Sequence, residues 1–174
     1  VELLPTENGM MRLSPEEAES MARRLGKKMC QMVISRFLER AKLEQYELSG
    51  EESIVDAPDV RMLCAVAQHD AALKILSSMG GLNALSLIAG EGELSAILSM
   101  QRACKTEPSI LLSIDGHLPV MDLFTDEKED APWRNLGEEQ ARHIEKAAFD
   151  LLTQLSSSSP VGRKAVSNTA QCND

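Results

Sequence analysis

Large aromatic rings are scarce in this chain. Aromatic residues make up 3% of its 174 residues, whereas apolar residues make up 43%, so a core must be built from Leu, Ala, Ile, Val and nine Met. Strands are enriched in aromatic and β-branched residues, and strand-like alternation is absent along the sequence. The composition therefore predicts an all-α protein, and the length suits one domain or one array of repeats.

Long apolar runs and paired cysteines are also missing. No uncharged run approaches the roughly 20 residues of a membrane-spanning helix, and the first residues lack a signal-peptide pattern, so we expect no membrane partner. The four cysteines lie far apart, with no CxxC and no Cys/His pair at metal spacing, so we expect no metal and no cofactor. Cys30, Cys64 and Cys104 stand at apolar helical positions, unlike Cys172. They are expected to be buried free thiols in a reducing compartment, which we take to be the cytoplasm.

A strongly basic segment is the third absence. The net charge is −9, and residues 1–57 carry 11 acidic and 8 basic side chains. A nucleic-acid partner would require clustered Lys and Arg to displace counterions from phosphates, so we expect none.

One long helix is predicted near the N-terminus. Ser14 is a suitable N-cap, Pro15 suits the first helical position, and Glu17 follows the cap by three residues. Apolar side chains then recur at intervals of three and four, which predicts a helix from about 15 to 47 with one buried face. These side chains belong to Ala18, Met21, Ala22, Leu25, Met29, Met32, Val33 and Phe37. The basic residues of this helix alternate with glutamates, and we interpret them as a solvated face of mixed charge.

The chain also contains an internal repeat. Residues 67–88 match residues 103–124 after a shift of 36, with identities at Ala67/Ala103, Leu76/Leu112, Ser77/Ser113, Gly80/Gly116, Leu82/Leu118 and Leu87/Leu123. A weaker third copy follows an acidic insertion at 125–137 and places Asn168 at the glycine position. Each copy predicts a helix ending near Ala67, Ala103 or Leu155, and then a short helix ending at Gly80, Gly116 or Asn168.

This pattern of a short helix, Gly-Gly, Leu-x-x-Leu and a longer helix ending in Ala resembles the armadillo repeat family over about residues 58–168. The resemblance implies a right-handed helical-repeat solenoid of armadillo-like type, with the long N-terminal helix packed on it. The expected organisation is an arm or loop at 1–13, a capping helix and linker at 14–57, and repeats with a polar tail at 58–174. The repeats span 58–92, 93–137 and a partial copy at 138–168. We expect the array to continue beyond this chain or to be capped by a partner.

The resemblance also implies a binding face on the longest helix of each repeat. Importin-like members carry Asn and Trp there, at positions that correspond to Ala65, Gln101 and Thr153 and to Arg61, Ile97 and Phe149. None of these positions has the family's residue, so binding of nuclear localisation signals is not expected. A different protein is expected to bind this face, at Arg61, Gln68, Gln101, Lys105, Phe149 and Thr153. The alternative interpretation is that these are ordinary solvated helix residues.

No catalytic residues are predicted. His69, His117 and His143 fall at three separate helical positions, and no phosphate-binding glycine loop, HExxH or GxSxG motif is present. The leading hypothesis is a non-enzymatic protein-binding scaffold or adaptor, with a co-chaperone suggested by fold analogy alone. One alternative is a structural or regulatory segment of a larger assembly. Another is an enzyme fragment with a cysteine nucleophile, which would need a histidine beside one of the four thiols.

Overall fold

The computed structural model describes residues 12–46, 53–125, 131–158 and 160–171. These residues form nine α-helices and no strand, which confirms the all-α prediction. The chain divides into two compact units, one ending at Ala84 and one beginning at Leu85, so the division falls inside helix α4 (Gly81–Ala89). The boundary expected between residues 57 and 58 lies within the first unit. The arm expected at 1–13 lies almost wholly outside the described residues.

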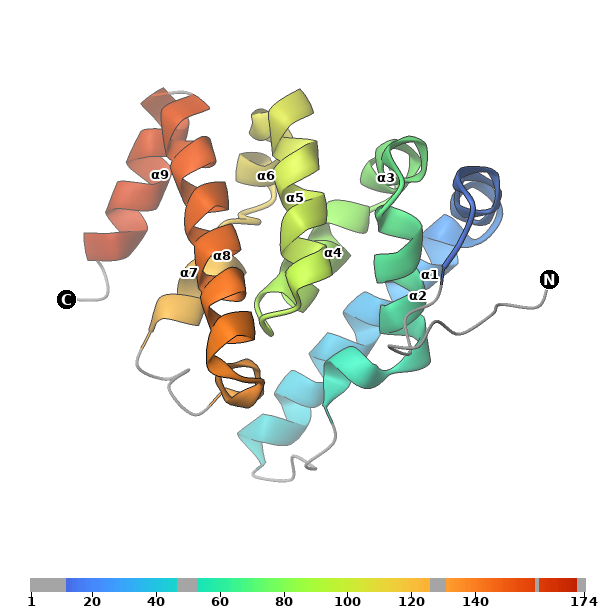
Figure 1. The fold of residues 1–174 in the computed structure, drawn as a ribbon, viewed down its shortest axis with the longest axis horizontal. Coiled ribbons are helices and arrows are strands. Elements are labelled where there is room, and N and C mark those ends of the chain that lie inside the picture. The colour runs from blue at the N-terminus through green and yellow to red at the C-terminus, as the bar shows by residue number, and fades with distance from the viewer. Residues whose placement is uncertain (1–11, 47–52, 126–130, 159, 172–174) are drawn as a thin grey trace. The chain divides into compact units, whose positions relative to one another are not determined.

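The first unit is organised around one long helix. Figure 1 shows α1 (Pro15–Gln45) beside α2 (Pro58–Ala67), and α1 packs against both α2 and α3 (Asp70–Ser77). The 3-10 turn η1 (Ile54–Asp56) precedes α2. The predicted N-cap of α1 is confirmed, because the Ser14 hydroxyl oxygen accepts a hydrogen bond of 3.1 Å from the Glu17 amide.

The buried face of α1 is narrower than the sequence predicts. Ala18, Ala22, Met29, Val33 and Phe37 are buried, in agreement with the periodicity. Leu25 and Met32 are exposed instead, with 44% and 46% of their surface accessible. Successive residues are rotated by about 100° around a helix, so these two side chains lie at the margin of the apolar stripe. The prediction that they are part of the core is therefore wrong.

The second unit is a cluster of helices around α8 (Glu138–Ser158). Figure 1 shows α8 between α5 (Leu94–Thr106) and α9 (Pro160–Gln171), and α6 (Pro108–Ser113) contacts both α5 and α9. The helix α7 (Leu118–Met121) and the 3-10 turn η4 (Pro132–Asn135) also contact α8, and the 3-10 turn η2 (Asp122–Phe124) follows α7. The core of this unit includes the fully buried side chains of Ile97, Met100, Leu111, Leu151 and Leu155.

The predicted repeat is reproduced only in part. The helix α2 ends at Ala67 and α3 is followed by Gly80 with φ +83, both as expected. In the next copy the left-handed residue is Asp115, with φ +52, and not Gly116. The Gly116 amide donates to the Leu111 carbonyl at 2.8 Å and the Asp115 amide to the Leu112 carbonyl at 3.2 Å, a Schellman motif with Asp115 in the left-handed position. The two glycines that align in sequence therefore do not occupy equivalent backbone positions.

The third copy departs further from the prediction. The helix α9 continues through position 168 to Gln171, so no turn is present at Asn168. The preceding helices are also longer than expected, because α5 ends at Thr106 and α8 at Ser158. A helix end depends on the packing around it as well as on the residue that follows, and the alignment contains no information about that packing.

The acidic insertion is anchored by its tryptophan. Trp133 is buried, with 3% of its surface exposed, and the left-handed Gly92 lies against its ring. The guanidinium of Arg134 lies over the same ring, 4.7 Å from its centroid, and donates to the Leu123 carbonyl at 3.0 Å. Trp133 therefore packs the insertion against the rest of the second unit. Residues 126–130 of the insertion lie outside the described residues.

Candidate protein-binding surfaces

The residues predicted to bind a partner are distributed over both units. In the first unit Arg61 is exposed on α2 and makes an ion pair of 2.8 Å with Asp56, and Gln68 is exposed at the C-terminal end of the same helix. In the second unit Lys105 is exposed on α5, and Phe149 and Thr153 are exposed on α8. These residues are therefore accessible, but accessibility alone does not make them a site.

Gln101 has a structural contact of its own. Its side-chain amide donates to the Ala147 carbonyl of α8 at 2.7 Å, and the Gln154 amide donates back to the Gln101 carbonyl at 3.5 Å. The half-buried Gln101 thus joins α5 to α8. Around the axis of α8, Phe149 is rotated by about 140° from Gln154 and by about 160° from Ala147. The Phe149 side chain therefore points away from the contact between α5 and α8. Gln101 and Phe149 therefore do not form one binding face.

Equivalent repeat positions also differ in exposure. Arg61 and Phe149 are exposed, whereas the matching Ile97 is fully buried. Ala65 is buried as well, although the matching Thr153 is exposed. A binding surface made of equivalent side chains, as in importin-like proteins, needs the same position to face outward in each repeat. The equivalent positions of this chain do not all face outward.

A different surface stands out on α1. An open hollow of about 320 Å³ is lined by Lys28, Gln31, Met32, Ser35, Arg36 and Glu39 of α1 and by Asp59 of α2. Its volume lies at the lower end of the range for ligand pockets, so it suits one or two side chains of a partner better than a whole small molecule. Met32 is the apolar member of this lining.

An ion pair connects the two helices that line the hollow. The Arg36 guanidinium donates from Nε to Asp59 Oδ2 at 3.1 Å, and its Nη2 lies 3.0 Å from Asp59 Oδ1. The Asp59 side chain is only 9% exposed and lies in the first turn of α2, where the helix dipole favours a negative charge. The Nε contact is a charge-assisted hydrogen bond, whereas the Nη2 contact is an ion pair only, because the buried Asp59 Oδ1 accepts no hydrogen bond from the described residues. Together these contacts hold Arg36 in the wall of the hollow.

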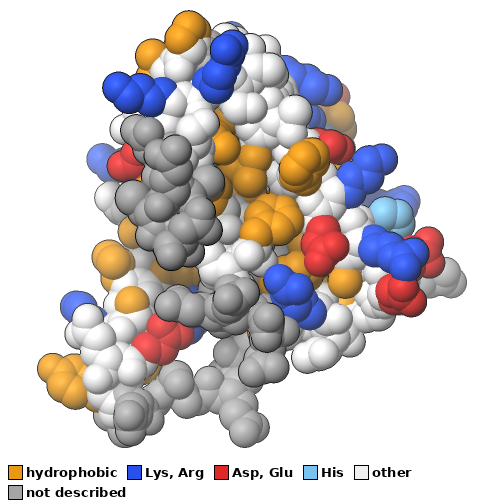
Figure 2. Space-filling model, turned by 90° about the vertical axis from the view of Figure 1, so that its left-hand side faces the viewer, with side chains coloured by type: hydrophobic (Ala, Val, Ile, Leu, Met, Phe, Trp, Pro, Cys, Tyr) orange, Lys and Arg blue, Asp and Glu red, His pale blue; other side chains and the backbone are white. Residues whose placement is uncertain are grey.

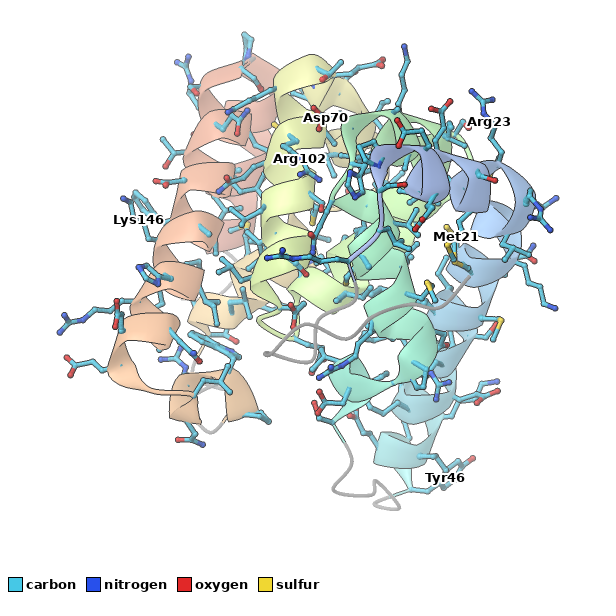
Figure 3. The ribbon with its side chains drawn as sticks, turned by 45° about the vertical axis from the view of Figure 1, so that its right-hand side comes forward. Met21, Arg23, Tyr46, Asp70, Arg102 and Lys146 are labelled. Carbon is cyan, nitrogen blue, oxygen red and sulfur yellow. The ribbon has the colours of Figure 1, made fainter. Side chains whose placement is uncertain are left out.

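Further apolar side chains continue along the same line of α1. Leu25 precedes Met32 by seven residues, Leu43 follows it by eleven, and Tyr46 lies just beyond the helix, so all four project from neighbouring angles. Figure 3 shows Tyr46 projecting from the end of α1. Tyr46 is 71% exposed. We call Leu25, Met32, Leu43 and Tyr46, with the residues that line the hollow, the α1 face.

No protein-family model, curated protein or solved structure matches this chain.

The second unit exposes apolar side chains more diffusely. Figure 2 views the side on which α9 lies and shows hydrophobic side chains near the middle of that face, among acidic and basic ones. The large exposed apolar residues of this unit are Leu98, Leu118, Phe124, Leu136, Phe149 and Val161. They are distributed over several helices and turns, and singly scattered apolar side chains are ordinary on a protein surface.

The titratable groups of the described core favour neutral forms. Burial raises the pKa of the Cys30 thiol to about 11 and also raises the pKa of Cys104, so neither thiol is a ready nucleophile at neutral pH. Cys30, Cys64 and Cys104 are buried free thiols, as predicted, and Cys172 lies outside the described residues. Burial lowers the pKa of His117, although the nearby Asp115 acts in the opposite direction.

The described residues also bear on metal sites and on membrane-spanning helices. Within 12–46, 53–125, 131–158 and 160–171, no three His, Cys, Asp or Glu side chains gather as metal ligands would. In the same part of the chain no single helix has the length and apolarity to cross a bilayer. The helices α3 and α4 reach that length and apolarity only when they are taken together, and the chain bends by 107° between them.

The sequence contained a weak indication of the α1 face. Arg23, Arg24, Lys27, Lys28 and Arg36 follow one another without an acidic residue between Glu19 and Glu39. Counted over the whole helix, the basic residues are interspersed with glutamates, and that count predicts a solvated face of mixed charge. Counted over the stretch between these two glutamates, they form a basic run with Leu25 and Met32 inside it.

Proposed function

We propose that this protein is a non-enzymatic binding scaffold that holds another protein on the α1 face. The observation that carries the proposal is the hollow beside Met32, which combines an exposed apolar side chain, flanking cations and a fixed ion pair in one place. Protein interfaces typically have an apolar anchor surrounded by polar and charged groups. The raised thiol pKa values of Cys30 and Cys104 are consistent with a protein that does not use a cysteine nucleophile.

We propose further that the helices from α2 onward are armadillo-like repeats. The order of elements supports this, since a helix, a short helix and another short helix occur twice, as α2, α3, α4 and as α5, α6, α7. Long α8 followed by α9 would be the beginning of a third set. The different left-handed residues at Gly80 and Asp115 indicate that the repeats are degenerate. In this proposal the surface that binds the partner is the outer helix α1 and not the long helices of the repeats.

The test uses a photo-crosslinking amino acid in place of Met32, with a matched variant at Leu98, which has a similar exposure of 43% on α5. We expect the residue at position 32 to crosslink one defined protein from the native cells, and the residue at position 98 not to do so. The captured protein is then purified, and its Kd is measured with the wild-type chain and with the Met32→Glu and Leu98→Glu variants.

The expected result is at least about tenfold weaker binding for Met32→Glu, since a charge replaces the apolar anchor, and about unchanged binding for Leu98→Glu. Equal crosslinking at both positions, or a Kd that is insensitive to Met32→Glu, would contradict the proposal. Thermal melts of the two variants check that both remain folded.

A further inference from the structure

The charge of α1 differs in sign from that of the whole chain. The helix carries seven basic and five acidic side chains, whereas the protein as a whole has a net charge of −9. All five acidic residues lie toward the two ends, at positions 16 to 19 and 39 to 44. The middle of α1 is therefore a cationic strip on an acidic protein.

Three of the cations in this strip have no partner among the described residues. Arg23 pairs with Glu19 at 2.8 Å, and Arg36 pairs with Asp59. Arg24, Lys27 and Lys28 are exposed, and the described part of the chain forms no ion pair with them. Exposed cations without partners are free to attract an anionic group at little desolvation cost.

The cations and the hollow lie in a fixed register along α1. Lys28 precedes Met32 by four residues and Arg24 precedes it by eight. Along the helix axis, Lys28 therefore lies about 6 Å from Met32 and Arg24 about 12 Å from it. An extended peptide advances by about 3.3 Å per residue. Its acidic residues would therefore reach Lys28 from about two residues away, and Arg24 from about four residues away, counted from the residue whose side chain enters the hollow.

The other side of the hollow has the opposite charge. Glu39 lines it one helical turn beyond Arg36, and Asp59 lies beside Arg36, where its charge is balanced. The surface around Met32 is therefore cationic toward the N-terminal end of α1 and acidic at Glu39. An anionic bilayer presents no such polarity and no single side chain to fill a hollow, so a peptide segment fits these observations better.

From this arrangement we propose that the α1 face binds an acidic protein segment that inserts one aliphatic side chain beside Met32 and directs its carboxylates toward Lys28 and Arg24. This inference rests on the proposed function, because it specifies the class of partner for the same surface. The aliphatic residue contributes the apolar contact, and the carboxylates contribute orientation and a salt-sensitive rate of association.

The experiment begins with selection of a displayed library of random short peptides on the full chain, followed by measurement of the Kd of the recovered peptides by fluorescence anisotropy. The test variant is Arg24→Glu/Lys28→Glu. The matched control is Lys146→Glu/Arg163→Glu, which reverses one Lys and one Arg that are exposed on α8 and α9. Figure 3 shows Lys146 projecting outward from α8.

We expect the recovered peptides to share an aliphatic residue with acidic residues on one side of it. Their Kd should rise by at least about tenfold in Arg24→Glu/Lys28→Glu and should stay within about twofold of wild type in the control. Added salt should weaken binding to the wild-type chain. Peptides that lose binding in Met32→Glu but not in Arg24→Glu/Lys28→Glu would overturn the inference about charge and leave the proposed function intact.

Two other outcomes overturn the inference more broadly. Peptides whose binding is insensitive to both Met32→Glu and Arg24→Glu/Lys28→Glu would overturn the proposed function as well, since the α1 face would then not be the site. Co-sedimentation with vesicles containing phosphatidylserine, absent with phosphatidylcholine alone and abolished by Arg24→Glu/Lys28→Glu, would show a membrane surface to be the partner if no acidic peptide binds.

Discussion

The two units of this protein stabilise their helices in different ways. In the first unit, α1 is joined to α2 by the Arg36–Asp59 ion pair, and the outer side of α1 keeps Leu25 and Met32 exposed. In the second unit, Trp133 is buried against Gly92, where an added Cβ would lie 2.4 Å from Trp133 Cγ. The apolar ring of the insertion in the second unit is thus buried, whereas apolar side chains along α1 in the first unit are accessible. Under the proposed function, the accessible apolar surface of α1 is what a partner contacts, whereas Trp133 serves the packing of the second unit.

The largest expected effect concerns the buried tryptophan of the second unit. We expect Trp133→Ala to lower the free energy of unfolding by about 4 kcal/mol, because it removes a buried ring and leaves a cavity over Gly92. Trp133→Phe keeps a ring there and should cost much less. Denaturant unfolding measures both. A loss for Trp133→Phe as large as that for Trp133→Ala would show that ring packing on Gly92 is not the stabilising contact.

The two left-handed glycines allow conformational strain to be separated from steric overlap. Gly92 and Gly80 have φ values of +82 and +83, but an added Cβ at Gly92 would lie 2.4 Å from Trp133 Cγ, whereas nothing lies within 4 Å of one at Gly80. We expect Gly92→Ala to cost about 3 kcal/mol, from strain and overlap together.

Gly80→Ala should cost about 1 kcal/mol, from strain alone. Chemical denaturation of the two variants, each compared with wild type, gives the difference. Equal losses at the two positions would mean that Trp133 moves aside without cost and that its contact with Gly92 does not stabilise the second unit.

The ion pair of the first unit should have an intermediate effect. Arg36→Ala leaves the nearly buried Asp59 carboxylate without its ion-pair partner and its hydrogen bond from Nε, and we expect a loss of about 1 to 2 kcal/mol, moderated by the partial exposure of Arg36. Arg61→Ala is the matched control, since its pair with Asp56 is exposed at both ends and should contribute less than about 1 kcal/mol. Thermal denaturation that shows a larger loss for Arg61→Ala would contradict this assignment.

The smallest effect concerns His117, which is buried at the start of α7 with 3% of its surface exposed. Burial lowers its pKa in the folded state, so below about pH 6.5 the unfolded chain binds the proton first. The stability associated with the neutral ring is fully present above that pH and declines as the pH falls toward the lowered pKa. Unfolding free energies of wild type and His117→Leu between about pH 7 and about pH 5 should diverge in this direction. A wild-type protein that gains stability relative to His117→Leu on acidification would contradict the assignment.

Local signals in the sequence predicted several parts of the fold correctly. The Ser14 cap, the end of α2 at Ala67 and the burial of Cys30 and Cys104 depend on residues close together in the chain. The exposure of Leu25 and Met32 depends instead on how wide a contact α2 and α3 make with α1, which periodicity does not encode. The left-handed turn at Asp115 depends on where α6 ends, and an alignment of two glycines has no information on that.

The candidate site was harder to predict than the fold. The sequence directed attention to the long helices of the repeats, where Gln101 turns out to join α5 to α8 and Ile97 is buried. The hollow beside Met32 requires Asp59 from α2 to lie against Arg36 of α1, 23 residues earlier in the chain. A contact between two helices separated by that distance in sequence is a property of the folded chain.

The central claim is that a partner binds to the α1 face, and methyl NMR of the methionines tests it directly. Among the nine methionines, Met32 is exposed on α1, Met29 is buried one turn earlier, and Met100 is buried in the second unit. On titration of the captured protein or of a selected peptide, we predict that the Met32 methyl signal shifts most and reaches half of its full change at the Kd, while the Met100 signal stays in place. A titration that shifts signals of the second unit and leaves Met32 unchanged would contradict the claim.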